Sequence, residues 1–169
     1  MTVTPADIHD ADRLAAVAAA TCPPDLAASD IHALVGQALS ADRFASYLAD
    51  EAYTVLKATE GAAIVGYAVL VANDPTNPEV ARAVTALPTL EVNKLYVRPE
   101  HHGAASALLT AALAHARDRG RAGAWLGVSR RNERAQRFYR KHGFDVVGTR
   151  TFQVGTRICD DYVMQAELS

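Results

Sequence analysis

The stretch "LEVNKLYVRPEHHGAASALLTAALAHARDRG", residues 90–120, decides the fold of this 169-residue chain. Leu90–Val97 predicts a strand that ends before Pro99, because proline has no backbone N–H to donate to a neighbouring strand. From Ala104 to Arg119, apolar residues at positions 105, 108, 109, 112 and 116 lie on one helical face, and Gly120 can cap the helix. The stretch therefore predicts a strand that passes through a short loop into an amphipathic helix.

A further strand is expected after this helix, at residues 123–128, "GAWLGV". Strands joined by a helical crossover lie parallel in the same sheet. The pattern elsewhere predicts a first strand reduced to residues 1–3, helices at 10–20, 29–39, 40–50 and 132–142, a short helix from Glu79, a hairpin of residues 52–58 and 62–72, and closing strands at 144–154 and 160–168. We expect an α/β (α+β) fold in which helices flank a mixed central sheet, forming one domain over residues 1–169.

The composition argues against several classes of protein. A net charge of -2 and a pI near 6.3 provide no basic field for nucleic acid. The longest apolar runs, such as residues 62–72, are too short to cross a bilayer. Cys22 and Cys159 lack the paired spacing of a zinc site and are expected to be free thiols. We therefore expect a cytoplasmic protein with neither a nucleic acid nor a membrane as its partner.

The loop "RPEHHGAAS", residues 98–106, is the first candidate for chemistry. A loop that enters a helix N-terminus presents unpaired N–H groups and the positive end of the helix dipole, which together can bind an anion. A tight connection between strand and helix explains the same residues equally well. His101 and His102 are sequence neighbours that point in different directions, so no metal site is expected there. The loop also lacks the glycine patterns of P-loop and dinucleotide-binding folds.

Two motifs in this order resemble the GNAT superfamily of N-acetyltransferases. The family loop Q/R-x-x-G-x-G/A falls on residues 100–105, "EHHGAA", and the pattern N-x-x-A-x-x-F/L-Y, followed by G-F, matches Asn132, Ala135, Phe138, Tyr139, Gly143 and Phe144. Within the superfamily, the chain most resembles PaiA-type bacterial polyamine N-acetyltransferases. Glu100 replaces the usual Gln or Arg, and its carboxylate would repel a pyrophosphate. Either Glu100 points outward, or His102 takes the Gln/Arg position and the helix starts earlier.

The resemblance implies that acetyl-CoA is the cosubstrate, with no metal. Main-chain groups of Leu95, Tyr96 and Val97 would pair with the pantetheine arm, for which the strands around residues 95 and 126 have to splay apart. Main-chain amides from His102 through Gly103, Ala104 and Ala105 to Ser106 would hold the pyrophosphate. Asn132 and Tyr139 would contact the cofactor as well, although Asn132 is also explained as a helix N-cap.

The resemblance also implies two residues for proton transfer. A primary amine with a pKa of about 10.4 is only ~0.04% neutral at pH 7, so a base is useful. Glu91 is the candidate base, and strand alternation would place Glu91, Asn93, Leu95 and Val97 on one face. Tyr139 is the candidate acid for the departing thiolate. Each residue has a plainer interpretation: Glu91 as a solvated strand residue and Tyr139 as a core residue on one helical face.

The expected reaction is acetyl transfer to a primary amine of a small molecule, by direct attack in a ternary complex. A polyamine is the first candidate acceptor, and the carboxylates available for such a cation are Glu91, Asp30, Asp160 and Asp161. Three alternatives stay open: a non-catalytic acyl-CoA sensor or partner-binding module, an enzyme that acetylates a peptide or protein amine, and a phosphate-binding protein unrelated to CoA. A homodimer also stays open.

Overall fold

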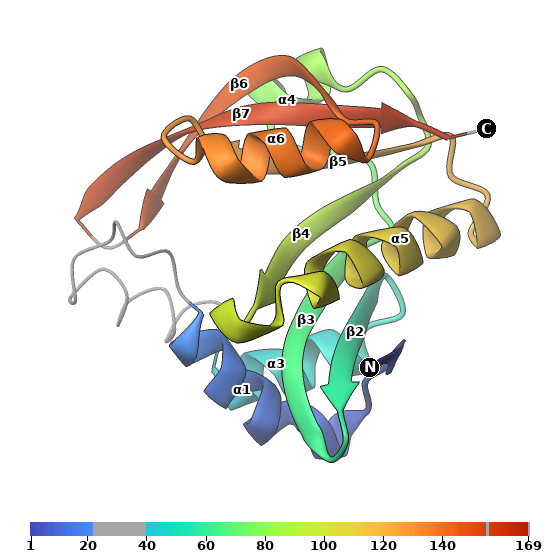
Figure 1. The fold of residues 1–169 in the computed structure, drawn as a ribbon. Coiled ribbons are helices and arrows are strands. Elements are labelled where there is room, and N and C mark those ends of the chain that lie inside the picture. Colours follow the sequence, from blue (N-terminus) through green and yellow to red (C-terminus); the bar gives the residue numbers. More distant parts are fainter. Residues whose placement is uncertain (22–39, 155, 169) are drawn as a thin grey trace.

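The computed structural model of the chain describes residues 1–21, 40–154 and 156–168. Within them, seven strands form one sheet in the order β1-β2-β3-β4-β5-β7-β6 (Figure 1). The strands are β1 (Thr2–Pro5), β2 (Tyr53–Glu60), β3 (Ala63–Val71), β4 (Thr89–Val97), β5 (Gly123–Ser129), β6 (Asp145–Val154) and β7 (Arg157–Glu167). β4 and β5 are parallel, and the other neighbouring strands are antiparallel. The expected mixed sheet is confirmed.

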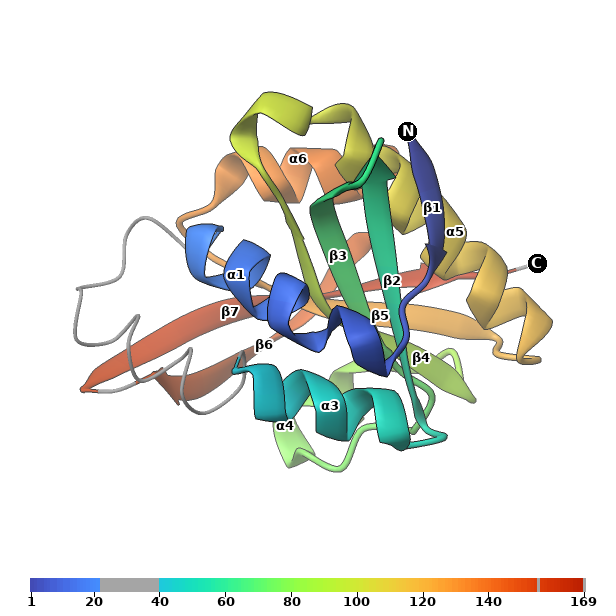
Figure 2. The same cartoon turned by 90° about the horizontal axis from the view of Figure 1, so that it is seen from below.

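Helices cover both faces of this sheet. They are α1 (Ala11–Ala20), α3 (Ala41–Ala49), α4 (Pro78–Ala83), α5 (Gly103–Asp118) and α6 (Glu133–Lys141), with short 3-10 turns η1 (Ile8–Asp10) and η3 (Pro99–His101). Figure 2 shows α1 and α3 in front of β2 and β3, with α5 behind these strands. Each helix lies within two residues of its expected bounds, but the helix expected at residues 29–39, with Asp30, lies outside the described residues.

Two apolar cores lie on opposite faces of the sheet. The larger packs α5 and Phe144 against Leu90, Val92 and Leu126 of the central strands. The smaller packs α1 and Phe44 of α3 against Val55 and Tyr67. Trp125 of β5 faces the same side as the smaller core, where it contacts Val80 and Val84 at α4. The sheet therefore separates an α5/α6 face from an α1/α3/α4 face.

A β-bulge in β4 corrects the expected facing of its residues. Leu70 of β3 pairs with Val92, and the next residue back, Val69, pairs with Lys94, so Asn93 is the extra residue. An extra residue reverses the alternation of side chains beyond it. Leu95 and Val97 consequently pack on the α5/α6 face, whereas Glu91 faces α1 and α3. The expectation that these residues share one face was wrong.

Among the residues that the structure describes, no helix is long and apolar enough to span a membrane.

Candidate active site

The parallel strands β4 and β5 separate partway along their length. They are paired at three positions, Thr89↔Gly123, Leu90↔Ala124 and Glu91↔Trp125. Beyond these pairs, β4 continues to Val97 beside β3, and β5 continues to Ser129 beside β7. Leu95, Tyr96 and Val97 thus lie on a stretch of β4 that is not paired with β5. The splay expected around residues 95 and 126 is present, and its vertex is the Glu91–Trp125 pair.

The loop after β4 turns directly into α5. Pro99–His101 form a 3-10 turn, and α5 begins at Gly103. Glu100 and His101 line a cavity of about 490 Å³ together with Arg13 of α1 and Ile64 of β3. His102 instead faces α6, where Arg134 Nη2 donates a hydrogen bond to His102 Nδ1 at 3.1 Å. The neighbouring histidines therefore point in different directions, as expected, and Glu100 lines the cavity beside α1.

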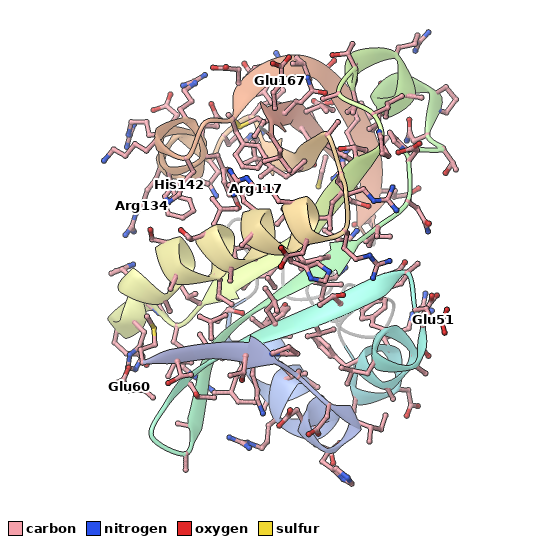
Figure 3. The ribbon with its side chains drawn as sticks, turned by 90° about the vertical axis from the view of Figure 1, so that its right-hand side faces the viewer. Glu51, Glu60, Arg117, Arg134, His142 and Glu167 are labelled. Carbon is pink, nitrogen blue, oxygen red and sulfur yellow. The ribbon has the colours of Figure 1, made fainter. Side chains whose placement is uncertain are left out.

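Two side-chain contacts connect the start of α5 with α6. The first is the Arg134–His102 hydrogen bond, and the second joins Ser106 Oγ to His142 Nε2 at 3.0 Å. His142 Nδ1 donates to the carbonyl oxygen of Phe138 at 2.9 Å, which orients the ring with Nε2 toward Ser106. Figure 3 shows Arg134 and His142 on the side of α6 that faces α5. Polar groups thus gather where the positive end of α5 lies.

The small residues at the start of α5 are small for different reasons. The methyl group of Ala104 is buried, with 1% exposure, in the core beneath α5. Packing therefore requires a small side chain at this position, and the main-chain amide of Ala104 lies in the first turn of α5. At Gly103, an added Cβ would meet no heavy atom within 4 Å. Gly103 is the residue whose size leaves the main chain open to a ligand.

Tyr139 and Asn132 are both placed by α6. The Tyr139 ring packs beside Phe138 and Phe144, with centroids at 5.3 and 6.0 Å. Burial, together with the nearby Tyr96 hydroxyl, raises the pKa of Tyr139, so its phenol keeps its proton at neutral pH. Asn132 is the N-cap of α6, because its Oδ1 accepts from the Ala135 N–H at 3.1 Å. The sequence-based interpretation of Asn132 as a cap is confirmed.

Glu91 is a half-buried carboxylate at the vertex. Burial raises the pKa of Glu91, although the hydrogen bond from Asn93 and the positive charges of Arg150 and Lys94 oppose this shift. Asn93 Nδ2 donates to Glu91 Oε2 at 2.9 Å. Lys94 Nζ lies 5.4 Å from the Tyr47 ring centroid, and burial lowers the pKa of Lys94 to about 8. Glu91 is therefore only partly exposed to solvent.

A second cavity, of about 300 Å³, opens beside Glu91 on the α1/α3/α4 face. Glu91, Trp125 and Arg150 line it, together with Tyr53, Val80 and residues 73–77. Arg150 of β6 reaches this wall across β7, so that its guanidinium lies over Gly127 and Trp125 of β5. Its Nε and Nη2 donate to Asp161 Oδ2 at 3.3 and 3.2 Å, and its guanidinium lies 5.4 Å from the Trp125 ring centroid. A carboxylate and a guanidinium from distant strands therefore share one cavity.

The sequence identified Glu91 at the vertex as a candidate site residue. Three basic residues that the structure places near the candidate site were not among the expected site residues: Lys94 beside Glu91, Arg150 on the cavity wall and Arg134 at the start of α5. Asp160 is exposed, and Asp161 is buried against Arg150. One signal was available for Arg150. A glycine inside a buried strand often marks a close approach by another group, and a Cβ at Gly127 would lie 2.2 Å from Arg150 Nη2.

No group of three or more His, Cys, Asp or Glu side chains suited to a metal ion is found in residues 1–21, 40–154 and 156–168.

Comparison with protein families and curated proteins gives consistent matches. The acetyltransferase (GNAT) family model matches residues 24–144. An uncharacterized N-acetyltransferase of Mycobacterium tuberculosis is 46% identical over 165 residues, which cover 94% of this chain and 98% of that protein. A protein of the same description from Mycobacterium bovis matches with the same values.

Solved structures share the fold at lower sequence identity. The PaiA N-acetyltransferase of Thermoplasma acidophilum, in complex with coenzyme A, superposes with a TM-score of 0.74 at 19% identity and covers 99% of this chain and 100% of its own. A probable acetyltransferase from Staphylococcus epidermidis reaches a TM-score of 0.81 at 12% identity, with 99% of each chain covered. A putative acetyltransferase from Salmonella typhimurium, with acetyl-CoA, gives 0.69 at 24% identity, covering 100% of this chain and 94% of its own.

Proposed function

Because the chain belongs to the GNAT family of acetyltransferases, we propose that it transfers an acetyl group from acetyl-CoA to a primary amine of a small molecule. Both substrates are bound at once, and the amine attacks directly. The observation that carries this proposal is the vertex at Glu91 and Trp125. There, β4 and β5 part on one side, and a cavity opens beside the same residues on the α1/α3/α4 face.

The described residues fit acetyl-CoA at two places. The main chain of Leu95–Val97 lies beyond the pairing of β4 with β5 and can bind an amide-bearing arm as a neighbouring strand would. The amides from His102 to Ser106 lie in the first turn of α5, where the helix dipole favours a pyrophosphate. Gly103 leaves that main chain open, and Asn132 and Tyr139 approach from α6.

Arg134 supplies the positive charge that the loop lacks at position 100. Glu100 lines the cavity on the α1 side, so its carboxylate is directed away from α6. Arg134 reaches from α6 to His102 at the start of α5. A guanidinium suits phosphate oxygens because its N–H groups form a planar fork. The pyrophosphate would therefore be held by the amides of α5 and by Arg134.

Proton transfer is assigned to Glu91 and Tyr139. Acetyl-CoA, when bound, supplies the acetyl group as a thioester. A C–N bond forms to the amine as the C–S bond breaks. The amine nitrogen gives up a proton toward Glu91, whose raised pKa makes it a stronger base than an ordinary glutamate. The sulfur takes a proton from the Tyr139 hydroxyl, which burial keeps protonated. Both side chains then exchange protons with water.

A polyamine is the acceptor suggested by the resemblance to PaiA-type enzymes. A polycation would need carboxylates at the acceptor end of the site. Glu91 lines the cavity, but Lys94 and Arg150 both lie near it. Asp161 does not line the cavity and is paired with Arg150. A polyamine therefore belongs in the acceptor panel alongside amines of other charge.

The test is an acetyl-CoA turnover assay with polyamines, amino acids, aminoglycosides and short peptides as acceptors. Release of CoA thiol and the mass of the acetylated product are measured together. Amine-dependent thiol release with at least one small-molecule acceptor is expected. Turnover with peptides alone would move the proposal to a peptide or protein amine.

A non-catalytic acyl-CoA sensor gives a different result in the same preparation. Acetyl-CoA would then raise the melting temperature, while no acceptor yields an acetylated product. Inorganic phosphate and ATP serve as controls in the melting experiment. A phosphate-binding protein unrelated to CoA would be stabilised by these ligands as well.

A further inference from the structure

The cavity beside the vertex carries opposite charges from two distant strands. Glu91 comes from β4 and Arg150 from β6, and both line the same space of about 300 Å³. This volume is at the lower end of the range for small-molecule sites. Trp125 lies on the same wall, beneath the Arg150 guanidinium. The cavity therefore has the size for a small ligand and a wall with separate anionic and cationic groups.

The Arg150 guanidinium is held in place by Asp161 and by the Trp125 ring. Its Nε and Nη2 donate to Asp161 Oδ2, and the Asp161 side chain has 6% exposure. Gly127 of β5 provides the space for it, because a Cβ there would lie 2.2 Å from Nη2. An arginine fixed by an ion pair and an aromatic ring loses little entropy when it binds a further group. This arrangement is suited to orienting a planar anion.

The other charged side chains near this cavity are Asp74 and Lys94, and they bear on which ligand Arg150 and Glu91 could bind. Asp74 also lines the cavity, but Arg121 Nη1 lies 4.0 Å from its Oδ1, which also accepts from the Thr89 N–H at 2.9 Å. Lys94 lies on the same face as Glu91 and carries its own positive charge. A polycation would meet Arg150 and Lys94 close to the candidate base. A molecule with one amine and one carboxylate would meet a complementary group for each.

We propose that the acceptor is a zwitterion of the amino-acid type, whose carboxylate binds Arg150 while its amine lies beside Glu91. The inference rests on the proposed acetyl transfer and deepens it by naming the substrate class. Arg150 acts on binding and orientation, and it takes no part in proton transfer. Arg150, held by Asp161 and accommodated by Gly127, then determines which acceptor the site selects.

Matched acceptors that differ only in the carboxylate test this proposal in the unchanged protein. Ornithine and putrescine form one pair, and lysine and cadaverine another, with spermidine and amino-acid amides added. We expect kcat/KM for the carboxylate-bearing member to exceed that of its partner by roughly 10- to 100-fold, the range for one hydrogen bond to a charged group. Equal or higher kcat/KM for the decarboxylated amines overturns the proposal.

Variants then assign the preference to Arg150. In Arg150→Gln, the kcat/KM values of the two acceptors in each pair should differ by no more than a few-fold, and the affinity for CoA should not change. Gly127→Ala is the second variant, because the nearest atoms that the added Cβ would meet all belong to the Arg150 guanidinium and none to the backbone. It should raise KM for the carboxylate-bearing acceptor more than it lowers kcat. Arg130→Gln is the matched control, since Arg130 also lies over an aromatic ring, 5.2 Å from the Tyr162 centroid, but does not line the cavity.

Each outcome separates this inference from the proposed acetyl transfer. A preference for the carboxylate that survives in both variants contradicts the role of Arg150. Turnover with polyamines alone leaves acetyl transfer intact and rejects the zwitterion. Absence of turnover with every amine, despite CoA binding, rejects the proposed function itself.

Discussion

Glu91 and Trp125 form the last pair between the parallel strands β4 and β5, and both side chains line the same cavity. The bulge at Asn93 follows at once, and it turns Leu95 and Val97 toward the α5/α6 face. The strand therefore presents Glu91 to one face of the sheet, and beyond Glu91 its main chain borders the splay and is not paired with β5. Under the proposed function, the donor would bind in the splay and the acceptor beside the carboxylate.

Removing the Tyr139 hydroxyl tests its assignment as the proton donor. Tyr139→Phe should lower kcat about 100-fold, the lower end of the range for general acid catalysis. The affinity for CoA and the melting temperature should change little, because the ring still packs beside Phe138 and Phe144. Tyr162→Phe, at another tyrosine packed against the same core, is the control. An unchanged kcat in Tyr139→Phe would remove the proton-donor role.

The pH profile tests Glu91 as the base. Burial raises the pKa of Glu91, so kcat/KM of the unchanged protein should fall on the acid side at a pH above the usual range for glutamate. Glu91→Gln should instead give a kcat/KM that rises steadily toward the amine pKa of about 10.4, as the neutral amine becomes more abundant. The loss is then largest at low pH. A loss of the same size at every pH argues against a base, and Glu51→Gln, at an exposed glutamate, is the control.

Adding one methyl group at Gly103 tests whether the pyrophosphate lies on the main chain of α5. Gly103 has a negative backbone φ and open space around its Cα, so Gly103→Ala should fold normally. The Kd for CoA should rise about tenfold, equivalent to ~1.4 kcal/mol. Binding of S-acetylpantetheine, which has no pyrophosphate, should not change. An unaltered Kd for CoA would place the phosphates elsewhere.

Arg134→Ala tests whether a cation from α6 compensates for Glu100. The Kd for CoA should rise by roughly tenfold at low salt, as expected for loss of one charge-assisted contact. The difference should shrink at high ionic strength because the site is exposed. Arg140→Ala removes an exposed arginine of the same helix and should have little effect. Equal changes in both variants would indicate a general effect of charge.

The βαβ unit could be predicted from the sequence because its signals are local. The helical periodicity from Ala104 onward fixed α5 to within one residue, and Asn132 marked the start of α6. A strand, a crossover helix and a second strand leave few topologies. The splay itself also followed from the resemblance, since it needs no particular side chain.

Two features could not be predicted from local sequence signals. They are the face of the sheet on which each β4 side chain lies, and the presence of Arg150 in the cavity beside Glu91. Residues 91–94 read as ordinary alternation, and only the pairing with β3 shows that Asn93 is an extra residue. Arg150 reaches the cavity because β7 lies between β5 and β6, an order that sequence spacing does not determine. The charges that face Glu91 come from β4 and β6, so they depend on long-range topology.

Initial rates measured against both substrates test the central claim most directly. If the donor lies in the splay and the acceptor beside Glu91, both must be bound before acetyl transfer. Double-reciprocal plots at several fixed acceptor concentrations should then intersect, and acetyl-CoA alone should leave no acetyl group on the protein. Parallel lines, together with an acetylated protein detected by mass spectrometry, would contradict direct transfer at the Glu91–Trp125 vertex.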